Sequence, residues 1–319
     1  MLRSLFLPLK LPINMTPSQA QQEIQVLSKQ IDEHNERYYV KHQPTIADTQ
    51  YDELLKKLMA LEEQFPQFKL PTSPSQRVGA KVEGNIPTVA HQNKMLSLDN
   101  TYSMEDIKDW VGRVVKGLDG VSPELMLEPK IDGVSCALMY RNGELVLGAT
   151  RGDGSVGEDV THNVRTIRSV PLKLKGAAPA VLEIRGEVYM DKEDFAKLNQ
   201  EREKAGEEIF VNPRNAASGA LKLLDSRLTA LRHLKFFVHS VGLLDGKNQP
   251  LTQGDFLQEC RTYGFMVNEH NRICKTFEEI VEFCQQIQQQ RQNLDYDVDG
   301  IVLKVNEIEL QKRLGHTLK

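Results

Sequence analysis

Apolar side chains recur three and four residues apart near the start of the chain, and this spacing predicts two amphipathic helices. The first begins at Thr16, an N-cap followed by Pro17 in the first turn, and continues to Tyr39. The second is capped by Asp48 and ends at Pro66. Because both helices have polar outer faces, we expect them to form a small helical hairpin.

Further along the chain, apolar and polar residues alternate, which is typical of strands with one buried face. Residues 134–140 alternate up to Asn142-Gly143, a pair that favours a tight turn between two strands. Other strands are expected over 182–188, 236–244 and 301–305, and a glutamine-rich helix over 277–291. Hairpins with interspersed helices predict an α+β fold of mainly antiparallel sheets rather than a doubly wound parallel sheet.

A segment rich in proline and serine, residues 71–75, is the best candidate for a linker. We therefore expect a helical domain over residues 15–73 and a strand-rich domain over residues 74–319. Residues 1–14 contain an arginine and an apolar run, but prolines and a lysine interrupt that run. We expect these residues to be an extension with no role in the fold.

The composition narrows the class of protein. A chain of 319 residues has room for about two domains, and 40% hydrophobic with 26% charged residues fits a globular protein. The net charge of −4 excludes a strongly basic body that holds nucleic acid by charge alone. No stretch is apolar over the roughly 18 residues needed to span a bilayer, so no membrane partner is expected. The four cysteines lie far apart, which argues against a zinc ribbon and favours a reducing cytoplasm.

One lysine stands between two carboxylates directly before the predicted hairpin. Lys130 follows Glu128 by two residues and precedes Asp132. The tight turn predicts that Val134 lies opposite Arg151, which would bring Lys130 and Arg151 to the same open end of the hairpin. Lys130 is then either an ordinary ion-pair partner or a nucleophile.

The neighbouring charged residues favour one chemistry for this lysine. A lysine amine attacks phosphorus only when it is neutral, so desolvation or a nearby cation must lower its pKa. Lys304, on the polar face of the last predicted strand, is a candidate for that cation. Arg151 can bind a phosphate, and Glu187 can accept a hydrogen bond from a ribose hydroxyl. This combination suits transfer of a nucleotidyl group through a covalent lysine phosphoramidate.

The segment Lys130-Ile131-Asp132-Gly133 resembles motif I of the covalent nucleotidyltransferases, the superfamily of DNA ligases, RNA ligases and mRNA capping enzymes. Further segments of the same kind, in chain order, are MLSLDN (95–100), RGDGSVGEDVTHNVRTI (151–167), RGEVYM (185–190), NPRNAASGALK (212–222) and DVDGIVLKVN (297–306). Together they resemble the adenylation region of bacterial NAD-dependent DNA ligases over residues 16–319.

This resemblance implies that Lys130 is the lysine that becomes modified by AMP, with NAD as the nucleotide donor. The residues that it places around the nucleotide are Ser97, Leu98, Glu128, Arg151, Glu187 and Lys304. Mg²⁺ would offset the phosphate charge, and no protein ligand is assigned to it. Arg214 and Lys222 match basic positions near the phosphate of a DNA nick, with a lysine at 222 where an arginine is expected.

In the helical domain, the resemblance implies a site for the nicotinamide mononucleotide half of NAD. Tyrosine rings can stack on a cationic ring, and carboxylates favour its positive charge. The matching residues are Tyr38, Tyr39, Asp48, Tyr51 and Asp52. Tyr51 has an alternative interpretation as a core residue of its helix.

The implied reaction has three steps. Neutral Lys130 attacks the adenylyl phosphorus of NAD and expels nicotinamide mononucleotide. The AMP passes to the 5′-phosphate of a nick in double-stranded DNA, and the 3′-hydroxyl then attacks that activated phosphate and releases AMP. We expect a cytoplasmic monomer.

Two alternatives stay open. Residues 152–157 spell G-x-G-x-x-G, the pattern of a Rossmann dehydrogenase, although Asp153 and Glu158 would repel a pyrophosphate there. The chain also stops at Lys319, before a further lysine and the DNA-binding modules that the resembled family carries. A fragment that binds nucleotide without sealing nicks is therefore the other alternative.

Overall fold

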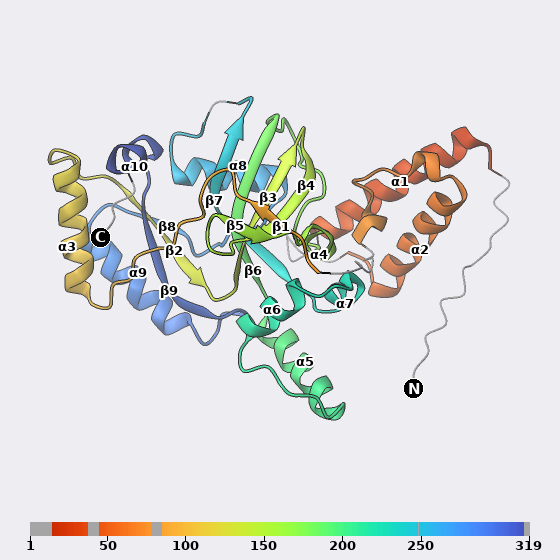
Figure 1. Cartoon of the computed structure of the whole chain (residues 1–319). Helices are drawn as coiled ribbons and strands as arrows, with labels where there is room; N and C mark the ends of the chain where they lie inside the picture. Colours follow the sequence, from red (N-terminus) through yellow and green to blue (C-terminus); the bar gives the residue numbers. More distant parts are fainter. Residues whose placement is uncertain (1–14, 38–44, 78–84, 248, 316–319) are drawn as a thin grey trace. The chain divides into compact units, whose positions relative to one another are not determined.

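The computed structural model describes residues 15–37, 45–77, 85–247 and 249–315. The chain divides into two compact units, residues 1–78 and residues 79–319 (Figure 1). Each unit is described by itself. Within the described ranges, no helix combines the length and the apolar character needed to cross a bilayer.

The first unit is the predicted pair of helices, α1 (Pro17–Asn35) and α2 (Asp48–Gln64), followed by the 3₁₀ turns η2 (Pro66–Phe68) and η3 (Pro74–Arg77). Thr16 caps α1 as predicted, and its side chain and that of Gln19 form a capping box. The predicted cap of α2 is wrong by one residue. Ala47 is the N-cap, and its N–H is satisfied by the side chain of Gln50 at 3.1 Å. The buried apolar residues shared by the two helices are Ile24, Leu27, Ile31, Leu58 and Leu61.

The segment predicted as a linker is folded onto α2. The hydroxyls of Ser73 and Ser75 donate hydrogen bonds to the carboxylate of Glu62, and the side chain of Glu62 is only 2% exposed. A buried carboxylate needs such donors, and these serines supply them. The proline and serine composition therefore marks a tight turn against the helix at this point.

The second unit contains three antiparallel sheets. The largest has the strand order β4-β3-β6-β7, the next has the order β8-β2-β9, and β1 pairs with β5. The strands are β1 (Thr88–Ala90), β2 (Leu125–Ile131), β3 (Val134–Arg141), β4 (Glu144–Thr150), β5 (Val156–Glu158), β6 (Val181–Tyr189), β7 (Lys235–Asp245), β8 (Arg272–Cys274) and β9 (Val298–Val305). Every strand pair among the described residues is antiparallel, and the predicted α+β fold is confirmed.

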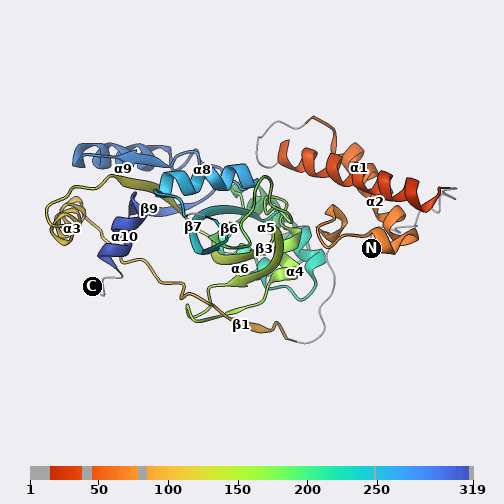
Figure 2. The same cartoon turned by 90° about the horizontal axis from the view of Figure 1, so that it is seen from above.

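Helices cover the sheets and close the main core. They are α3 (Met104–Gly117), α4 (Thr161–Thr166), α5 (Lys192–Lys204), α6 (Pro213–Leu221), α7 (Ser226–Ala230), α8 (Gln253–Tyr263), α9 (Phe277–Gln290) and α10 (Ile308–Leu314). Figure 2 shows α8 and α9 on one side of this unit and β1 on the other. Buried residues of α4, α6 and α8 join those of the four-stranded sheet in one apolar cluster.

One detail of the predicted hairpin is wrong. The turn at Asn142 is present, but the register shifts between Met139 and Tyr140, so that Cys136 lies opposite Thr150. This shift removes the predicted pairing of Val134 with residue 151. Lys130, the lysine of the first motif, precedes the hairpin as predicted, but its strand β2 belongs to the three-stranded sheet rather than to the sheet of the hairpin. The alternation of apolar and polar residues did not reveal that β2 and β3, which follow one another in the chain, belong to different sheets.

Candidate active site

Lys130 stands at the end of β2, where its backbone lies opposite Gly300 of β9. Its Nζ donates a hydrogen bond to Oδ2 of Asp299 at 2.7 Å, and both side chains are about one third exposed, at 38% and 33%. The two residues are 169 positions apart in the sequence, and the pairing of β2 with β9 brings their motifs together. Asp299 was quoted within its motif but was not predicted as a site residue.

Glu187 on β6 belongs to the same electrostatic environment. It accepts a hydrogen bond from Ser135 Oγ at 2.8 Å. Burial raises the pKa of its carboxyl from 4.5 to about 7, against the opposing effects of the Ser135 hydrogen bond and the positive charges of Arg214 and Lys130. The positive charge of Lys130 therefore acts on the Glu187 carboxyl, although the two side chains form no hydrogen bond or ion pair among the described contacts.

Gly133 is the last residue of the first motif, and its lack of a side chain allows the chain at the start of β3 to lie close to β6. A Cβ atom at this position would lie 2.3 Å from the backbone oxygen of Val188 and 2.9 Å from Cγ of Glu187. Any side chain would therefore push β3 away from Glu187. The glycine of the motif thus has a steric reason in the fold.

A second cluster surrounds Glu128, whose side chain is buried on β2. Lys304 Nζ donates to both of its carboxylate oxygens at 2.9 Å and to the backbone oxygen of His239 at 2.6 Å. Gln253 Nε2 donates to Glu128 Oε1 at 2.9 Å and to the same His239 oxygen at 2.8 Å. Burial lowers the pKa of His239 to about 3, and the positive charges of Lys304 and Arg185 act in the same direction. Sequence reasoning found the two charged members of this cluster and missed the other two.

Arg151 reaches the predicted nucleotide-binding pair at 97–98. Its Nη1 donates to Ser97 Oγ at 3.3 Å, and the side chain of Leu98 is 58% exposed. The chain leading to Ser97 is held by Arg185, which donates to the backbone oxygens of Lys94 at 3.0 Å and of Asn93 at 2.6 Å. Arg185 was missed as a site residue, although it opens one of the quoted motifs.

The glycine pattern at 152–157 forms a β-turn between β4 and β5. Gly152 has φ +55°, and a Cβ there would lie 1.8 Å from the backbone oxygen of Val156. The carboxylate of Asp153 accepts both turn N–H groups, those of Ser155 and Val156, at 2.8 Å. These two amides are taken by the protein's own carboxylate, and β4 is antiparallel to its neighbour β3, whereas a Rossmann turn follows a buried parallel strand. The dehydrogenase alternative is therefore rejected.

The two cations predicted to contact DNA both form ion pairs with carboxylates. Arg214, in the first turn of α6, lies 3.2 Å from Asp132 of the first motif. Lys222, at the C-terminal cap of α6, lies 2.5 Å from Glu158 of β5. The side chain of Arg214 is 52% exposed, and that of Lys222 is 41% exposed. A phosphate that binds either cation has to compete with the carboxylate.

In the helical unit, Tyr51 and Asp52 lie in the first half of α2. The hydroxyl of Tyr51 donates to Asn35 Oδ1 of α1 at 2.9 Å, and its half-buried ring packs against the helical core. Asp52 is exposed. Asp48 is the first residue of α2. Tyr38 and Tyr39 lie outside the described residues.

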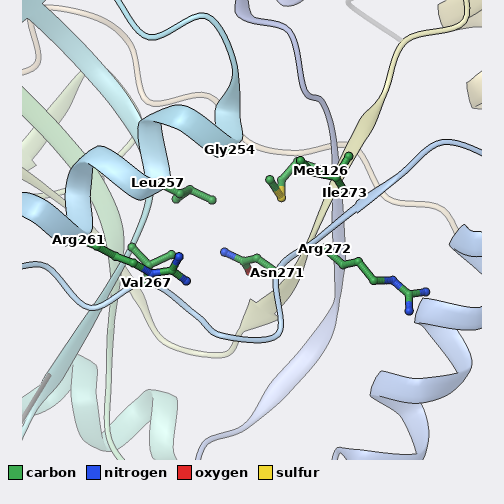
Figure 3. A pocket seen from close by; sticks show the side chains of 8 residues that line it. All are labelled: Met126, Gly254, Leu257, Arg261, Val267, Asn271, Arg272 and Ile273. Carbon is green, nitrogen blue, oxygen red and sulfur yellow. The ribbon is translucent and has the colours of Figure 1, made fainter. Parts of the chain in front are cut away.

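A pocket of about 340 Å³ lies beside the Glu128 cluster, between β2, β8 and α8 (Figure 3). Figure 3 shows Met126, Leu257 and Asn271 directed towards its centre, whereas Arg272 points away from it. None of the described residues that were predicted for the site lines this pocket. Within the described ranges, no group of three or more His, Cys, Asp and Glu side chains is arranged to hold a metal ion.

Comparisons with known proteins agree with these motifs. The family model of the NAD-dependent DNA ligase adenylation domain matches residues 83–319, and that of the DNA ligase-like N-terminal NAD⁺-binding domain matches residues 17–79. A DNA ligase of Cellvibrio japonicus is 49% identical over 92% of this chain and 43% of its own length. DNA ligases of Thermotoga neapolitana and Endomicrobium trichonymphae are 47% and 45% identical over 95% and 94% of this chain. The chain spans 43–44% of the length of these curated relatives.

Proposed function

Because the chain belongs to the family of NAD-dependent DNA ligase adenylation domains, we propose that it carries out the adenylation step of a DNA ligase that uses NAD. The substrate of this step is NAD, and the product is a lysine that carries AMP. The observation that supports the proposal most directly is the hydrogen bond of the motif lysine, Lys130, to Asp299 of a second motif, with Glu187 of a third motif within electrostatic range of Lys130.

Lys130 is the proposed nucleophile. Its Nζ forms a bond to the adenylyl phosphorus, and the bond from that phosphorus to the bridging oxygen of NAD breaks, so that nicotinamide mononucleotide leaves with the electron pair. The attacking amine must be neutral, and its proton therefore has to leave Nζ. Asp299 Oδ2, at 2.7 Å, is within hydrogen-bond reach to accept it.

The remaining site residues are proposed to hold the adenosine part. Glu128, buried on β2, accepts from the adenine amino group, and Glu187 and Arg151 contact the ribose and the groups next to it. Lys304 lies against Glu128, which supports a contact near the base. Its contact with the α-phosphate is proposed from the family resemblance alone. Ser97 and Leu98 complete the pocket from the segment held by Arg151.

The helical unit is proposed to bind the nicotinamide mononucleotide half, which fits its match to an NAD⁺-binding domain. Tyr51 and Asp52, together with Tyr38, Tyr39 and Asp48, are the proposed contacts. Magnesium is the proposed cation, and it would offset the phosphate charge. In phosphoryl-transfer sites this ion takes many of its ligands from phosphates and water, and no residue of this chain is assigned as its ligand.

Nicked double-stranded DNA is the proposed acceptor of the AMP, with Arg214 and Lys222 near the nick phosphate. The ion pairs that these cations form with Asp132 and Glu158 would open when DNA binds. We propose that the protein is a cytoplasmic monomer; its four free cysteines fit the proposed location.

Mass spectrometry of the intact chain tests the adenylation step. After incubation with NAD and magnesium, we expect a mass increase of one AMP that is absent from Lys130→Ala. Lys192→Ala is a suitable control, because Lys192 also lies near a carboxylate, Asp297, at 3.8 Å. No mass increase in the unmodified chain would favour the alternative of a fragment that binds nucleotide without reacting.

Replacing NAD by ATP tests the helical unit. If the helical residues recognise the nicotinamide half, ATP should give no adduct. Adenylation by ATP at a comparable rate would contradict the roles of Tyr51 and Asp52. A gel assay on nicked DNA then separates adenylation from strand sealing.

A further inference from the structure

Gln253 is a buried polar residue at the first position of α8, and its side chain is only 5% exposed. Its backbone is held firmly. The Gln253 N–H donates to the backbone oxygen of Asn306 at 2.6 Å, and the next N–H, that of Gly254, donates to Asn306 Oδ1 at 3.1 Å. Thr252 caps the helix through a capping box with Asp255. The side-chain amide is therefore presented from a fixed point.

The amide of Gln253 has the same two acceptors as the ammonium group of Lys304. Both donate to the carboxylate of Glu128 and to the backbone oxygen of His239. The difference lies in the carboxylate oxygens. Lys304 bonds to Oε1 and Oε2 equally, at 2.9 Å, whereas Gln253 bonds to Oε1 alone. Of these two donors, Gln253 is the one that distinguishes the two oxygens of Glu128. Its hydrogen bond therefore restrains the rotation of the carboxylate group about the bond that joins it to the side chain.

We propose that Gln253 is a positioning residue that makes the site select adenine over guanine. This inference rests on the proposed function, in which Glu128 faces the base. Oε1 accepts from both Gln253 and Lys304, whereas Oε2 accepts from Lys304 alone, so Oε2 has the larger remaining acceptor capacity; in this proposal it faces the base and acts there only as an acceptor. The amino group of adenine is a donor and matches it. Guanine carries a carbonyl oxygen at that position, and two acceptors in a buried site repel each other.

Loss of the Gln253 amide would relax this selection. Lys304 alone would then hold the carboxylate, and with one restraint fewer the carboxylate could turn its acceptor oxygen away from a guanine oxygen. A site built to form a hydrogen bond with one ligand rejects an analogue that cannot form it, because polar groups of the site are then left without a partner. This rejection is strong only if those polar groups stay in place. The lost discrimination should be about tenfold, the value for one hydrogen bond of ordinary strength.

The test compares the affinities for AMP and GMP of the full chain by isothermal titration calorimetry, which needs no covalent reaction. Gln253→Met keeps the volume and removes the donor, and the ratio of the two affinities should fall by about tenfold. Gln253→Lys restores a donor towards Glu128 and should recover most of the ratio. Gln258→Met, on the exposed face of the same helix, is the matched control and should leave the ratio unchanged.

A kinetic measurement extends the test to the reaction. For Gln253→Met, KM for NAD should rise and that for nicotinamide guanine dinucleotide should fall, with kcat for NAD nearly unchanged. An unchanged affinity ratio in Gln253→Met, or an equal loss of both affinities, would overturn the proposal, since either result leaves Gln253 with a purely structural role. Failure of the proposed function would be seen in a different measurement, because the unmodified chain would then form no lysine adduct with AMP. The ratio of the affinities for AMP and GMP would still test the role of Gln253.

Discussion

The amine of Lys130 and the carboxylate of Asp299 lie 2.7 Å apart across the antiparallel pairing of β2 with β9. The proposed nucleophile is thus held by a group that can take its proton. The same pairing places Lys304 of β9 within reach of Glu128 of β2. One strand pair therefore carries both halves of the proposed site, the amine proposed to react and the carboxylate proposed to face the base.

The Lys130–Asp299 pair should matter for reaction rather than for stability. In Asp299→Asn, we expect the rate of adenylation by NAD to fall roughly a hundredfold, because the proton acceptor and the orientation of Nζ are both lost. The free energy of unfolding should change by less than about 1 kcal/mol, since exposed ion pairs contribute little. Asp297→Asn, two residues away and 39% exposed, is the control and should adenylate normally. Equal rates for the two variants would contradict the role of Asp299.

The half-buried carboxyl of Glu187 should make stability depend on pH. Burial raises its pKa from 4.5 to about 7, so between these pH values the folded protein binds more protons than the unfolded chain. The free energy of unfolding should therefore decrease as the pH rises through this window. Glu187→Gln removes the effect, and at pH 8 the variant should be more stable by about 3 kcal/mol, given about 1.4 kcal/mol for each pKa unit.

Urea denaturation at a series of pH values measures this effect. The curve of unfolding free energy against pH should be flatter for Glu187→Gln than for the unmodified chain between about pH 4.5 and 7. Parallel curves for the two proteins would show that the carboxyl titrates alike in the folded and unfolded states.

The Arg185–Glu183 ion pair is nearly buried, with side chains 13% and 4% exposed and a separation of 2.8 Å. Arg185→Met should lower the free energy of unfolding by about 3–5 kcal/mol, because Glu183 is left as an unpaired buried charge. The double variant Arg185→Met with Glu183→Leu should recover part of this loss. Lys197→Met is the control, since its pair with Glu193 is 61% and 80% exposed, and the expected change is below about 1 kcal/mol. Additive effects of the two substitutions would contradict the coupling.

Glu158 should restrain Lys222 from binding DNA. In Glu158→Gln, the lysine loses its partner at 2.5 Å, and we expect a several-fold higher affinity for nicked DNA at low salt. The slope of log affinity against log salt should steepen by about 0.9, the value for one phosphate contact. Fluorescence anisotropy with a labelled nicked duplex measures both quantities. Glu193→Gln removes an equal charge from an exposed site, and an equal effect there would mean that only net charge changed.

Local patterns were enough to predict several elements of this fold, although β2 and α8 were not among them. The spacing of Ile24, Leu27 and Ile31 predicted α1, and the cap at Thr16 is present as predicted. The turn at Asn142 and the alternation around it predicted the β3–β4 hairpin. These features depend on residues a few positions apart, and their hydrogen bonds and buried faces are defined within the element itself.

The linker and the register were predicted less well because they depend on contacts with distant residues. The serines at 73 and 75 belong to the helical unit because Glu62 needs their hydroxyls. The shift between Met139 and Tyr140 has no signature in the alternation of β3. A bulge is set by how a strand packs on its neighbours, and those neighbours include β6.

The sequence by itself determined the family motifs and the candidate residues for the chemistry, because a lysine between carboxylates and the ordered motifs can be read without coordinates. Only the tertiary structure decided how these residues are partnered. Lys130 is paired with Asp299, Glu128 is shared by Lys304 and Gln253, and these pairs join residues more than a hundred positions apart. The physical reason is that a short-range pattern defines a strand and its faces, whereas the partner of a charge is chosen by which strands and helices pack together.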